Sequence, residues 1–292
     1  MVREWGVAAL VEAGPLRVVL AVKHPLTELS WLEQRIIITA ADGKIEFENK
    51  VDWRENRICL KVEFPLNVNC DYATYETQFG YIQRPTHYNT SWDLARFEVC
   101  GHRYADLSEY GFGVALLNDS KYGYSTKGGV MRMSLLRSPK APDDTTDMEI
   151  HEFRFALYAH KGAFLESDVV KKAYQYNEKP IVHPTLVSPT GLLAKEFFTV
   201  SKENFVLDTV KVAEDARVTG KNGQVDVVLR FYEAYGGRGI ATVETLFNIK
   251  EARFCNILED MEDAVTVEDG KNLVIPFAPF QIVTVRLLIG PN

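Results

Sequence analysis

The residues best suited to chemistry in this sequence lie in one stretch, residues 78–93, which is rich in aromatic, amide and basic side chains and poor in aliphatic ones. Protein sites for sugars combine hydrogen-bonding side chains with aromatic rings that cover the apolar face of the sugar. Because this composition is unsuited to an ordinary buried strand, we expect a long loop that presents polar groups. A structured surface loop whose polar groups satisfy one another is the alternative. The candidate binding residues of this loop are Arg84, His87, Asn89 and Trp92.

Two shorter clusters could also carry chemistry. In the first, His102, Arg103 and Asp106 could face a cleft together, or could form a turn in which Asp106 accepts hydrogen bonds from backbone amides. In the second, Arg230 lies in a strand pattern and Arg238 follows a Gly-Gly corner, which is equally typical of a cross-strand ion pair beside a turn. No pair of catalytic carboxylates stands out, because most of the 40 Asp and Glu residues fall on the polar positions of alternating patterns.

Several catalytic and cofactor classes leave no trace in the sequence. The phosphate-binding loop G-x-x-x-x-G-K-[ST], the dinucleotide motif G-x-G-x-x-G, the nucleophile elbow G-x-S-x-G and the zinc motif H-E-x-x-H are all absent. The six histidines are scattered without the short spacings that zinc sites repeat. We therefore expect no metal ion or cofactor to be bound by this chain alone.

Composition and charge indicate which kinds of binding partner and which cellular compartment to expect. A net charge of −7 argues against binding to the phosphate backbone of nucleic acids, which requires a basic surface. No apolar run approaches the length of about 20 residues needed for a membrane-spanning helix, and the amino terminus lacks the pattern of a signal peptide. The four cysteines show no C-x-x-C spacing, so we expect reduced cysteines in a cytoplasmic protein, with Cys59 and Cys100 buried among apolar neighbours.

Alternation of apolar and polar residues dominates the chain and predicts an all-β protein. The runs recur at spacings near ten residues, as is typical of antiparallel sandwiches, and only residues 167–175 have a helical pattern. Three prolines within residues 178–191 exclude a helix or a central strand there. We therefore expect a large β-sandwich over residues 1–178, a linker over 179–191 and a smaller C-terminal β-sandwich over 192–292. The expected strands cover residues 16–23, 36–39, 45–52, 58–64, 72–78, 96–102, 113–117, 130–136, 152–158, 197–200, 205–212, 225–232, 240–247, 273–277 and 281–288.

A series of short strings, spread over nearly the whole chain, resembles the carboxy-terminal half of family 38 glycoside hydrolases, the α-mannosidases. The resemblance is to the cytosolic branch that trims free oligosaccharides. The strings are VDW (51–53), LKVEFP (60–65), YETQFG (75–80), RPTH (84–87), NTSWD (89–93), ADLSE (105–109), ALLND (115–119), HEF (151–153), HKG (160–162), YEA (232–234) and PFQ (279–281).

The resemblance implies a galactose-mutarotase-like super-sandwich, truncated at its N-terminal side, and then a smaller sandwich. Family 38 enzymes are retaining glycosidases whose zinc ion (or another divalent metal), nucleophilic aspartate and acid/base aspartate lie in an amino-terminal catalytic domain. No residue here can be matched to those roles, so we expect a catalytically silent fragment of a hydrolase that removes terminal α-mannose from oligosaccharides. The expected partners are the missing amino-terminal catalytic domain, a mannose-containing oligosaccharide and a second copy of the chain, with no nucleic acid and no membrane.

In this family the sandwich touches the catalytic domain, and its loops can line the cleft beside the sugar. The resemblance therefore implies a substrate-side or interdomain role for the candidate residues Arg84, His87, Asn89, Trp92, His102, Arg103 and Asp106, with Arg230 and Arg238 behind them. Two other hypotheses fit the all-β pattern. One is a stand-alone carbohydrate-binding module, and the other is a sugar epimerase of the mutarotase-like class, for which no converging His and Glu pair stands out.

Overall fold

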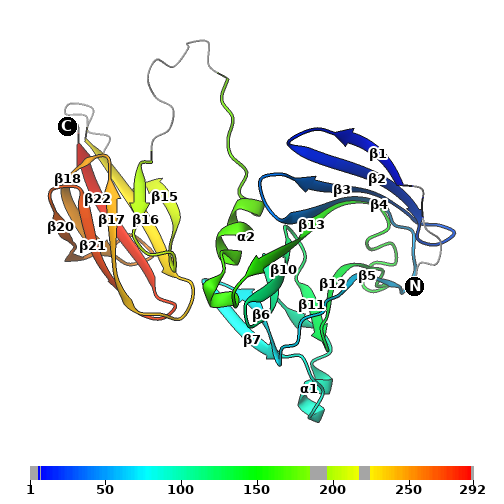
Figure 1. Ribbon diagram of the computed structural model, residues 1–292. Helices are drawn as coiled ribbons and strands as arrows, with labels where there is room; N and C mark the ends of the chain where they lie inside the picture. The colour runs from blue at the N-terminus through cyan, green and yellow to red at the C-terminus, as the bar shows by residue number, and fades with distance from the viewer. Residues whose placement is uncertain (1–5, 7, 185–195, 217–223, 291–292) are drawn as a thin grey trace. The chain divides into compact units, whose positions relative to one another are not determined.

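The computed structural model describes residue 6 and residues 8–184, 196–216 and 224–290 (Figure 1). The chain divides into two compact units, one formed by Met1–Gln78 and Ile82–Pro180 and the other by Phe79–Tyr81 and Ile181–Asn292. Each unit contains two antiparallel sheets, so the prediction of an all-β protein built from sandwiches is confirmed. Of the expected linker, residues 179–184 have no regular secondary structure, and residues 185–191 lie outside the described part of the chain.

The larger sheet of the first unit has nine strands in the order β1-β2-β3-β4-β13-β10-β9-β6-β7. Consecutive strands pair from β1 to β4, whereas β13 returns from a distant part of the sequence to pair with both β4 and β10. The strands are β1 (Ala8–Ala13), β2 (Arg17–Pro25), β3 (Trp31–Thr39), β4 (Lys44–Asp52), β6 (Tyr72–Thr77), β7 (Gly80–Pro85), β9 (Tyr104–Glu109), β10 (Phe112–Asn118) and β13 (Ile150–Lys161).

A smaller sheet of four strands, in the order β5-β12-β11-β8, packs on one face of the nine-stranded sheet, which we call the inner face. Phe64 of β5 contacts Phe47 of β4 and Phe155 of β13, with ring centroids 5.8 and 6.1 Å apart. These contacts place β5, an edge strand, over β4 and β13 (Figure 1). The four strands are β5 (Cys59–Pro65), β8 (Val99–Cys100), β11 (Gly123–Lys127) and β12 (Val130–Arg137).

The inner face becomes progressively more exposed from β13 towards β1. One cross-strand row runs from Phe155 through Phe47, Ile36 and Leu20 to Leu10. Phe155 is buried, the three middle side chains are half-buried, and Leu10 is 62% exposed. Among the described residues, the four-stranded sheet thus covers the inner face as far as β4 and the end of β3 that carries Leu32, and it leaves β1, β2 and the rest of β3 exposed.

The opposite face of β2, β3, β4 and β13 carries a ladder of alternating charges, as the sequence pattern predicts for a solvated face. Lys23 of β2 pairs with Glu33 of β3 at 3.0 Å. Arg35 of β3 pairs with Glu48 of β4 at 3.4 Å. Lys50 and Glu152 continue the ladder onto β13 at 3.4 Å. Because these pairs are exposed, each contributes at most about 1 kcal/mol to stability.

Two short helices belong to the first unit. Helix α2 (Val169–Asn177) follows a 3₁₀ turn, η1 (Phe164–Glu166), and confirms the helical pattern at 167–175. It contacts β9 and β10 and buries Val169, Val170 and Ala173 on the face opposite to the four-stranded sheet. Helix α1 (Ser91–Ala95) begins at a capping box in which Thr90 and Asp93 exchange side-chain to backbone hydrogen bonds. No helix in the described residues is long and apolar enough to cross a membrane.

The second unit packs a four-stranded sheet, β14-β17-β21-β20, on a five-stranded sheet, β15-β16-β22-β18-β19. Its core stacks Phe205 on Phe231 and Phe277, with centroids 4.9 and 5.0 Å apart. The strands are β14 (Phe198–Val200), β15 (Phe205–Val212), β16 (Val225–Glu233), β17 (Gly239–Thr245), β18 (Asn248–Cys255), β19 (Met261–Ala264), β20 (Thr266–Glu268), β21 (Asn272–Phe277) and β22 (Ile282–Gly290).

Two sequence predictions about local structure are wrong. The expected strand at 96–102 is reduced to β8, because helix α1 and the bend after it occupy the preceding residues. Cys59 and Cys100 are exposed rather than buried, since each lies on an edge strand of the four-stranded sheet with its side chain in an exposed position. Of the four cysteines, all of them free, only Cys255 is buried.

Candidate functional site

The stretch expected to be a long loop is mostly regular structure. Its first part is strand β7, which ends at Pro85, and its last part is helix α1. Arg84 projects from β7, donates a hydrogen bond to the Cys100 carbonyl at 2.5 Å and lies over the Tyr75 ring at 5.2 Å. Its guanidinium therefore ties β7 to β8 and β6. The stretch forms strand because β7 pairs with β6 in a hairpin, a pairing that composition alone does not reveal.

The turn between β7 and α1 borders an open hollow of about 650 Å³. His87 lies on its wall, with Nδ1 3.6 Å from an Asp93 carboxylate oxygen and 3.3 Å from the Asn89 amide nitrogen, which donates to it. Lys127 crosses from β11, donates to the Pro85 and His87 carbonyls and places its ammonium 4.5 Å from the centre of the Tyr88 ring. Burial opposes the charged form of Lys127 and lowers the pKa of its ammonium, despite the nearby Asp93. The wall also includes the polar residues Asn69, Asp71, Thr86 and Arg132.

Helix α1 and the bend that follows it present aromatic and aliphatic side chains to solvent. Trp92 is 75% exposed, and Leu94 and Phe97 are exposed to a similar extent. Asn89 is exposed beside them. The candidates Arg84, His87, Asn89 and Trp92 therefore all lie in or between β7 and α1, and of these four only His87 lines the hollow.

Arg103 lies elsewhere, in a half-buried ion pair with Glu76 of β6. Its guanidinium is 2.6 Å from Glu76, its backbone N–H donates to the same carboxylate at 2.6 Å, and it stacks on the Tyr174 ring of α2 at 3.8 Å. Burial disfavours the charged guanidinium, but the hydrogen bond and the charge of Glu76 outweigh it, so the pKa of Arg103 is raised. The pair joins β6 and β9 to α2.

Asp106 is fully buried on β9 and forms a dyad with His160 of β13. The His160 Nε2 and Asp106 Oδ2 atoms are 2.7 Å apart, and Ser108 donates to the other carboxylate oxygen at 2.5 Å. Gly113 of β10 lies between these strands, opposite both Ser108 and His160 in register, where a Cβ atom would collide with both side chains. Residues 104–109 are thus a central strand rather than the turn weighed from the sequence.

The charge state of His160 depends on this dyad. Burial disfavours the imidazolium, but the hydrogen bond to Asp106 and its negative charge outweigh that penalty, so the pKa of His160 is raised above its usual value of 6.5. Tyr158 stacks on the His160 ring and donates to Asp168 at 2.7 Å. Burial first, and then Asp168, raise the pKa of Tyr158. All three side chains of the cluster are buried, and Tyr158 links it to Asp168 at the start of α2.

Of the remaining candidates, His102 directly precedes Arg103, and its backbone N–H donates to the Glu76 carbonyl at 3.1 Å. The His102 ring packs edge-on against Tyr122, with centroids 5.4 Å apart, and the His102 carbonyl accepts hydrogen bonds from Asn118 and Tyr124. In the second unit, Arg230 of β16 donates to Thr284 and to the Ile257 carbonyl. Arg238 is exposed at the bend between β16 and β17.

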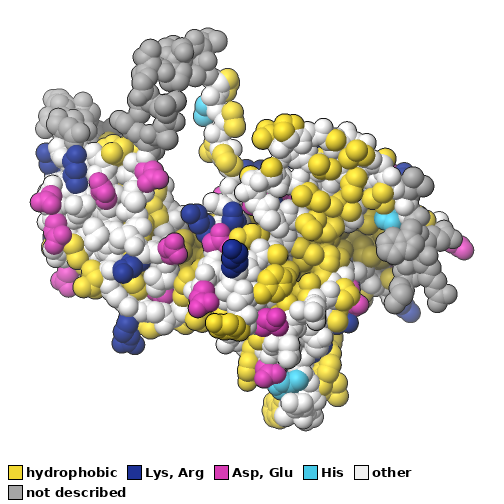
Figure 2. Space-filling model, viewed as in Figure 1, with side chains coloured by type: hydrophobic (Ala, Val, Ile, Leu, Met, Phe, Trp, Pro, Cys, Tyr) yellow, Lys and Arg dark blue, Asp and Glu magenta, His cyan; other side chains and the backbone are white. Residues whose placement is uncertain are grey.

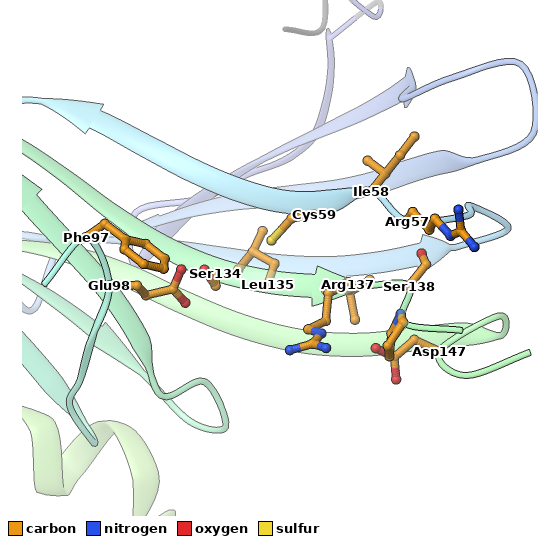
Figure 3. Close-up of a pocket in the computed structure, with 12 residues that line it drawn as sticks. Arg57, Ile58, Cys59, Phe97, Glu98, Ser134, Leu135, Arg137, Ser138 and Asp147 are labelled. Carbon is orange, nitrogen blue, oxygen red and sulfur yellow. The ribbon is translucent and has the colours of Figure 1, made fainter. Parts of the chain in front are cut away.

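A second hollow, of about 770 Å³, lies on the outer face of the four-stranded sheet and contains none of the candidate residues (Figure 3). Cys59 of β5 and Ser134 and Arg137 of β12 form its floor, with Glu98 and Asp147 on loops beside it (Figure 3). Glu98 pairs with Lys61 at 2.5 Å. Burial opposes ionisation of Glu98, but Lys61 and Ser134 outweigh it, so its pKa is lowered.

The buried carboxylates of the described residues all have partners within their own unit. Retaining glycosidases need two carboxyl groups about 5–5.5 Å apart on either side of a bound sugar, but these acids serve internal hydrogen-bond networks instead. The six are Glu55 (with Thr27 and Ser30), Glu76, Asp93, Asp106, Glu233 and Glu259 (with Lys211).

The zinc ion that the resemblance implies for the catalytic domain has no fitting donor set here. Among the described residues, no group of three or more His, Cys, Asp or Glu side chains could hold a metal ion. The dyad of His160 and Asp106 offers only two such donors, and these bond to each other. The described residues do not fit the metal.

Glu233, which is not among the candidates predicted from the sequence, organises a corner of the second unit. It is fully buried at the end of β16 and accepts hydrogen bonds from Asn204 Nδ2 (2.8 Å) and from the backbone N–H groups of Tyr235 (3.0 Å), Gly236 (2.8 Å) and Phe280 (2.9 Å). Burial opposes its ionisation, but the donors outweigh it and the pKa of Glu233 is lowered. In the sequence, the adjacent Gly236, whose φ is +77°, was the residue that could have indicated a tight corner at this position.

Comparisons with known proteins connect both units to one family. The description "Glycosyl hydrolases family 38 C-terminal domain" matches residues 2–145, and "Glycosyl hydrolases family 38 C-terminal beta sandwich domain" matches residues 204–285. Human alpha-mannosidase 2C1 is 44% identical over 90% of this chain, and alpha-mannosidase G of Dictyostelium discoideum is 41% identical over 97%. The chain spans about a quarter of the length of either relative.

The fold agrees with these matches. The crystal structure of an alpha-mannosidase from Enterococcus faecalis V583 superposes with a TM-score of 0.76 over 96% of this chain and 35% of its own, at 15% identity. At that identity the superposition establishes the shared fold, and the family profiles and relatives establish the kinship. The chain belongs to glycosyl hydrolase family 38, of which it carries the C-terminal β domains.

Proposed function

We propose that this chain is the C-terminal β region of a cytoplasmic retaining α-mannosidase that hydrolyses terminal α-mannose from oligosaccharides. In this proposal the chain supplies a scaffold, part of the wall of the substrate cleft and an interdomain surface, and it is inactive alone. The zinc ion and both catalytic aspartates belong to the part of the parent protein that precedes this region. Arg84, His87, Asn89 and Trp92 are the residues proposed to face the substrate or the catalytic domain.

The observation that carries the proposal is the engagement of every buried carboxylate in the described residues, seen in a chain that spans a quarter of its α-mannosidase relatives. A carboxylate held by two to four internal hydrogen bonds is not free to attack a sugar or protonate a leaving group. Free cysteines support the cytoplasmic setting, since a reducing compartment keeps thiols unpaired.

The test is an assay of the purified chain with an aryl α-mannoside, with and without added zinc. We expect no turnover above the rate without protein. The chain should restore metal-dependent hydrolysis when it is mixed with a separate polypeptide that carries the unmatched three quarters, roughly, of alpha-mannosidase G from Dictyostelium. Metal-dependent turnover by the chain alone would refute the proposal, and so would a mixture that neither assembles nor hydrolyses.

Self-association is part of the same proposal. The uncovered inner face of β1–β3 exposes Leu10, Val18 and Ile38 to water, and apolar surface of this kind favours contact between copies. We expect the apparent mass in light scattering to rise with protein concentration and to fall when the partner polypeptide is added. A monodisperse monomer at all concentrations would contradict this part.

A stand-alone carbohydrate-binding module is the second candidate function. The observation that favours it is the hollow with Asn69, Asp71, His87 and the exposed Tyr88 on its wall, together with the exposed Trp92 on helix α1, since sugar sites combine aromatic rings with polar groups. Titration calorimetry with mannobiose separates the two. Millimolar or tighter binding to the chain alone, abolished by Trp92→Ala, would favour the module, whereas no binding favours the enzyme part.

A further inference from the structure

The outer face of the five-stranded sheet in the second unit contains a buried patch that the core of that unit does not explain. Leu229 and Val285 belong to the core between the two sheets, so their neighbours Val228 of β16 and Thr284 of β22 project from the opposite face. Val228 and Thr284 are nevertheless 0% and 4% exposed. Cys255 of β18, opposite Thr284 in register, is also buried on this outer face. This patch must therefore lie under another part of the chain.

The loop of residues 256–260, between β18 and β19, folds back over this face, and we call it the strap. Its position is fixed by contacts with two strands further along the sheet. Arg230 of β16 donates to the Ile257 carbonyl at 3.2 Å, and Lys211 of β15 donates to the Glu259 carboxylate. Because β22 and β16 lie between β18 and β15, and neighbouring strands are about 4.8 Å apart, the contacts of the strap extend roughly 14 Å across the sheet.

The strap is held to the sheet by polar contacts rather than by apolar ones. Its large apolar side chains, Ile257 and Leu258, are 61% and 76% exposed, and of its five residues only Glu259 is buried. Glu259 accepts hydrogen bonds from Lys211 and from the Glu214 N–H, the latter at 2.8 Å. Burial opposes the ionisation of Glu259, but these donors outweigh it, so the pKa of its carboxyl group is lowered. Glu259 is therefore the latch of the strap.

The latch differs from the ordinary surface charges of this unit. Figure 2 shows charged side chains of both signs spread over one face of the second unit, and exposed ion pairs contribute little to stability. The Glu259 side chain is only 6% exposed, although its partner Lys211 is 40% exposed. Loss of either partner should therefore leave a buried group without its partner or remove the strongest contact of the strap.

The strap is also ordered internally, so it can move as one piece. The Asn256 side-chain oxygen accepts hydrogen bonds from the N–H groups of Leu258 (2.9 Å) and Asp260 (3.1 Å), and its NH₂ group donates to the Asp260 carboxylate at 2.9 Å. The Asn256 N–H donates to the Asp260 carbonyl at 3.1 Å. All these bonds lie within the strap and remain intact when its contacts with β15 and β16 are broken.

We propose that the strap is a cover, latched by Glu259, that opens while both sheets of the second unit stay folded and thereby controls chemical access to the Cys255 thiol. Cys255 directly precedes the strap, is 6% exposed and is the only cysteine of the second unit. Segments held by few apolar contacts open locally at a lower free energy than the core around them. The closed strap thus shields the thiol from electrophiles and disulfides in solution, and opening makes it reactive.

Alkylation of the complete chain with N-ethylmaleimide, a small neutral reagent, measures opening at the thiol. The thiol adds across the double bond of the reagent, and mass spectrometry of peptides gives a rate for each cysteine. We expect Glu259→Gln to accelerate alkylation of Cys255 at least tenfold and to leave the exposed Cys59 and Cys100 of the first unit within twofold. Asp263→Asn, at an exposed carboxylate of β19, is the control and should change the Cys255 rate less than twofold. Equal effects of the two variants would overturn the proposal.

A second variant separates opening of the strap from a change in the charge of the thiol. Burial first, and then the negative charge of Glu259, raise the pKa of the Cys255 thiol, so Glu259→Gln favours the reactive thiolate even with the strap closed. Lys211→Gln breaks the same latch but removes a cation, which disfavours the thiolate. We therefore expect Lys211→Gln to accelerate alkylation of Cys255 at least threefold. An unchanged or slower reaction in this variant would overturn the proposal.

Amide exchange distinguishes opening of the strap from unfolding of the whole unit. We expect the amides of β16 and β22 to exchange at the wild-type rate in Glu259→Gln and in Lys211→Gln, while Cys255 reacts faster. Exchange in β16 and β22 that accelerates in proportion to alkylation would mean that the reagent reaches the thiol only when the unit unfolds. That result would overturn the proposal too.

Discussion

The substitution Glu233→Gln is the sharpest test of how the second unit is held together. Each carboxylate oxygen accepts two hydrogen bonds: Oε1 from Asn204 and the Tyr235 N–H, and Oε2 from the Gly236 and Phe280 N–H groups. A glutamine keeps one oxygen and turns the other position into a donor. Because the neighbours are all donors, the new NH₂ group cannot be accommodated without loss.

The magnitude follows from the better of the two orientations. If the new NH₂ faces Asn204, that amide can rotate to accept from it, and only the Tyr235 N–H loses its acceptor. A lost hydrogen bond to a charged group amounts to about 1.5–3 kcal/mol, and the two bonds to the remaining oxygen become roughly half as strong without the charge. We therefore expect Glu233→Gln to lower the free energy of unfolding of the second unit by about 3–5 kcal/mol.

The two units can be followed separately, because tryptophans occur only in the first. All four tryptophans lie before residue 93, so tryptophan fluorescence during urea unfolding reports on the first unit. Amide exchange of β16 and β22 reports on the second. Glu233→Gln should accelerate amide exchange in β16 and β22. The control Glu244→Gln, at an exposed carboxylate of β17, should change the unfolding free energy derived from that exchange by less than about 0.5 kcal/mol. A Glu233→Gln effect below about 1 kcal/mol would refute the reasoning.

Acid should remove the same contribution. Because the pKa of Glu233 is lowered in the folded state, its stabilisation is present above the unfolded pKa near 4.5 and is lost as the pH falls through the folded value. The difference in unfolding free energy between the wild type and Glu233→Gln should therefore be constant from pH 7 to pH 5 and shrink below pH 4.5. A difference that grows in acid would contradict the assigned direction.

Three further predictions concern buried groups. His160→Gln should lower the free energy of unfolding by about 3 kcal/mol at pH 6, because it leaves Asp106 without its cation. Since the pKa of His160 is raised in the folded state, this ionic contribution is fully present below pH 6.5 and is lost as the pH rises through the folded pKa. The urea midpoints of variant and wild type should therefore converge at alkaline pH. Glu76→Gln should cost about 2 kcal/mol in the same assay by breaking the half-buried pair with Arg103, and an unchanged midpoint would count against that role. Leu229→Ala should destabilise the second unit by about 2–5 kcal/mol in amide exchange, and a smaller loss would mean that the core refills the cavity.

Much of the fold could be predicted because local alternation and global packing agree. β4 follows its sequence pattern closely, with Phe47 and Val51 facing the core and Glu46 and Glu48 facing outwards; the exception is the polar Asn49, which is buried on the core face. The polar turn before it joins two antiparallel neighbours, as a D-G sequence predicts. In such strands the type of each residue, apolar or charged, predicts which face of the sheet its side chain occupies.

The candidate clusters could not be predicted in the same way, because their partners lie far away in the sequence. Asp106 looks like a turn residue next to Ser108, yet it is buried because His160, 54 residues later, is brought opposite by the pairing of β10 with β9 and β13. Glu76 and Arg103 are 27 residues apart and meet only once β6 pairs with β9. The composition of 78–93 correctly identified polar and aromatic residues but not the hairpin that converts half of them into strand.

The charge ladder on β2, β3, β4 and β13 has a consequence for how the strands find their alignment. A slip of one residue would turn apolar side chains to water, but a slip of two keeps every side chain on its own face and escapes that penalty. Here a two-residue slip of β3 along β4 would place Glu33 opposite Glu48, or Arg35 opposite Lys50. Like charges would then face each other across the sheet, so the exposed ion pairs, weak as individual bonds, exclude the misalignments that hydrophobic burial tolerates.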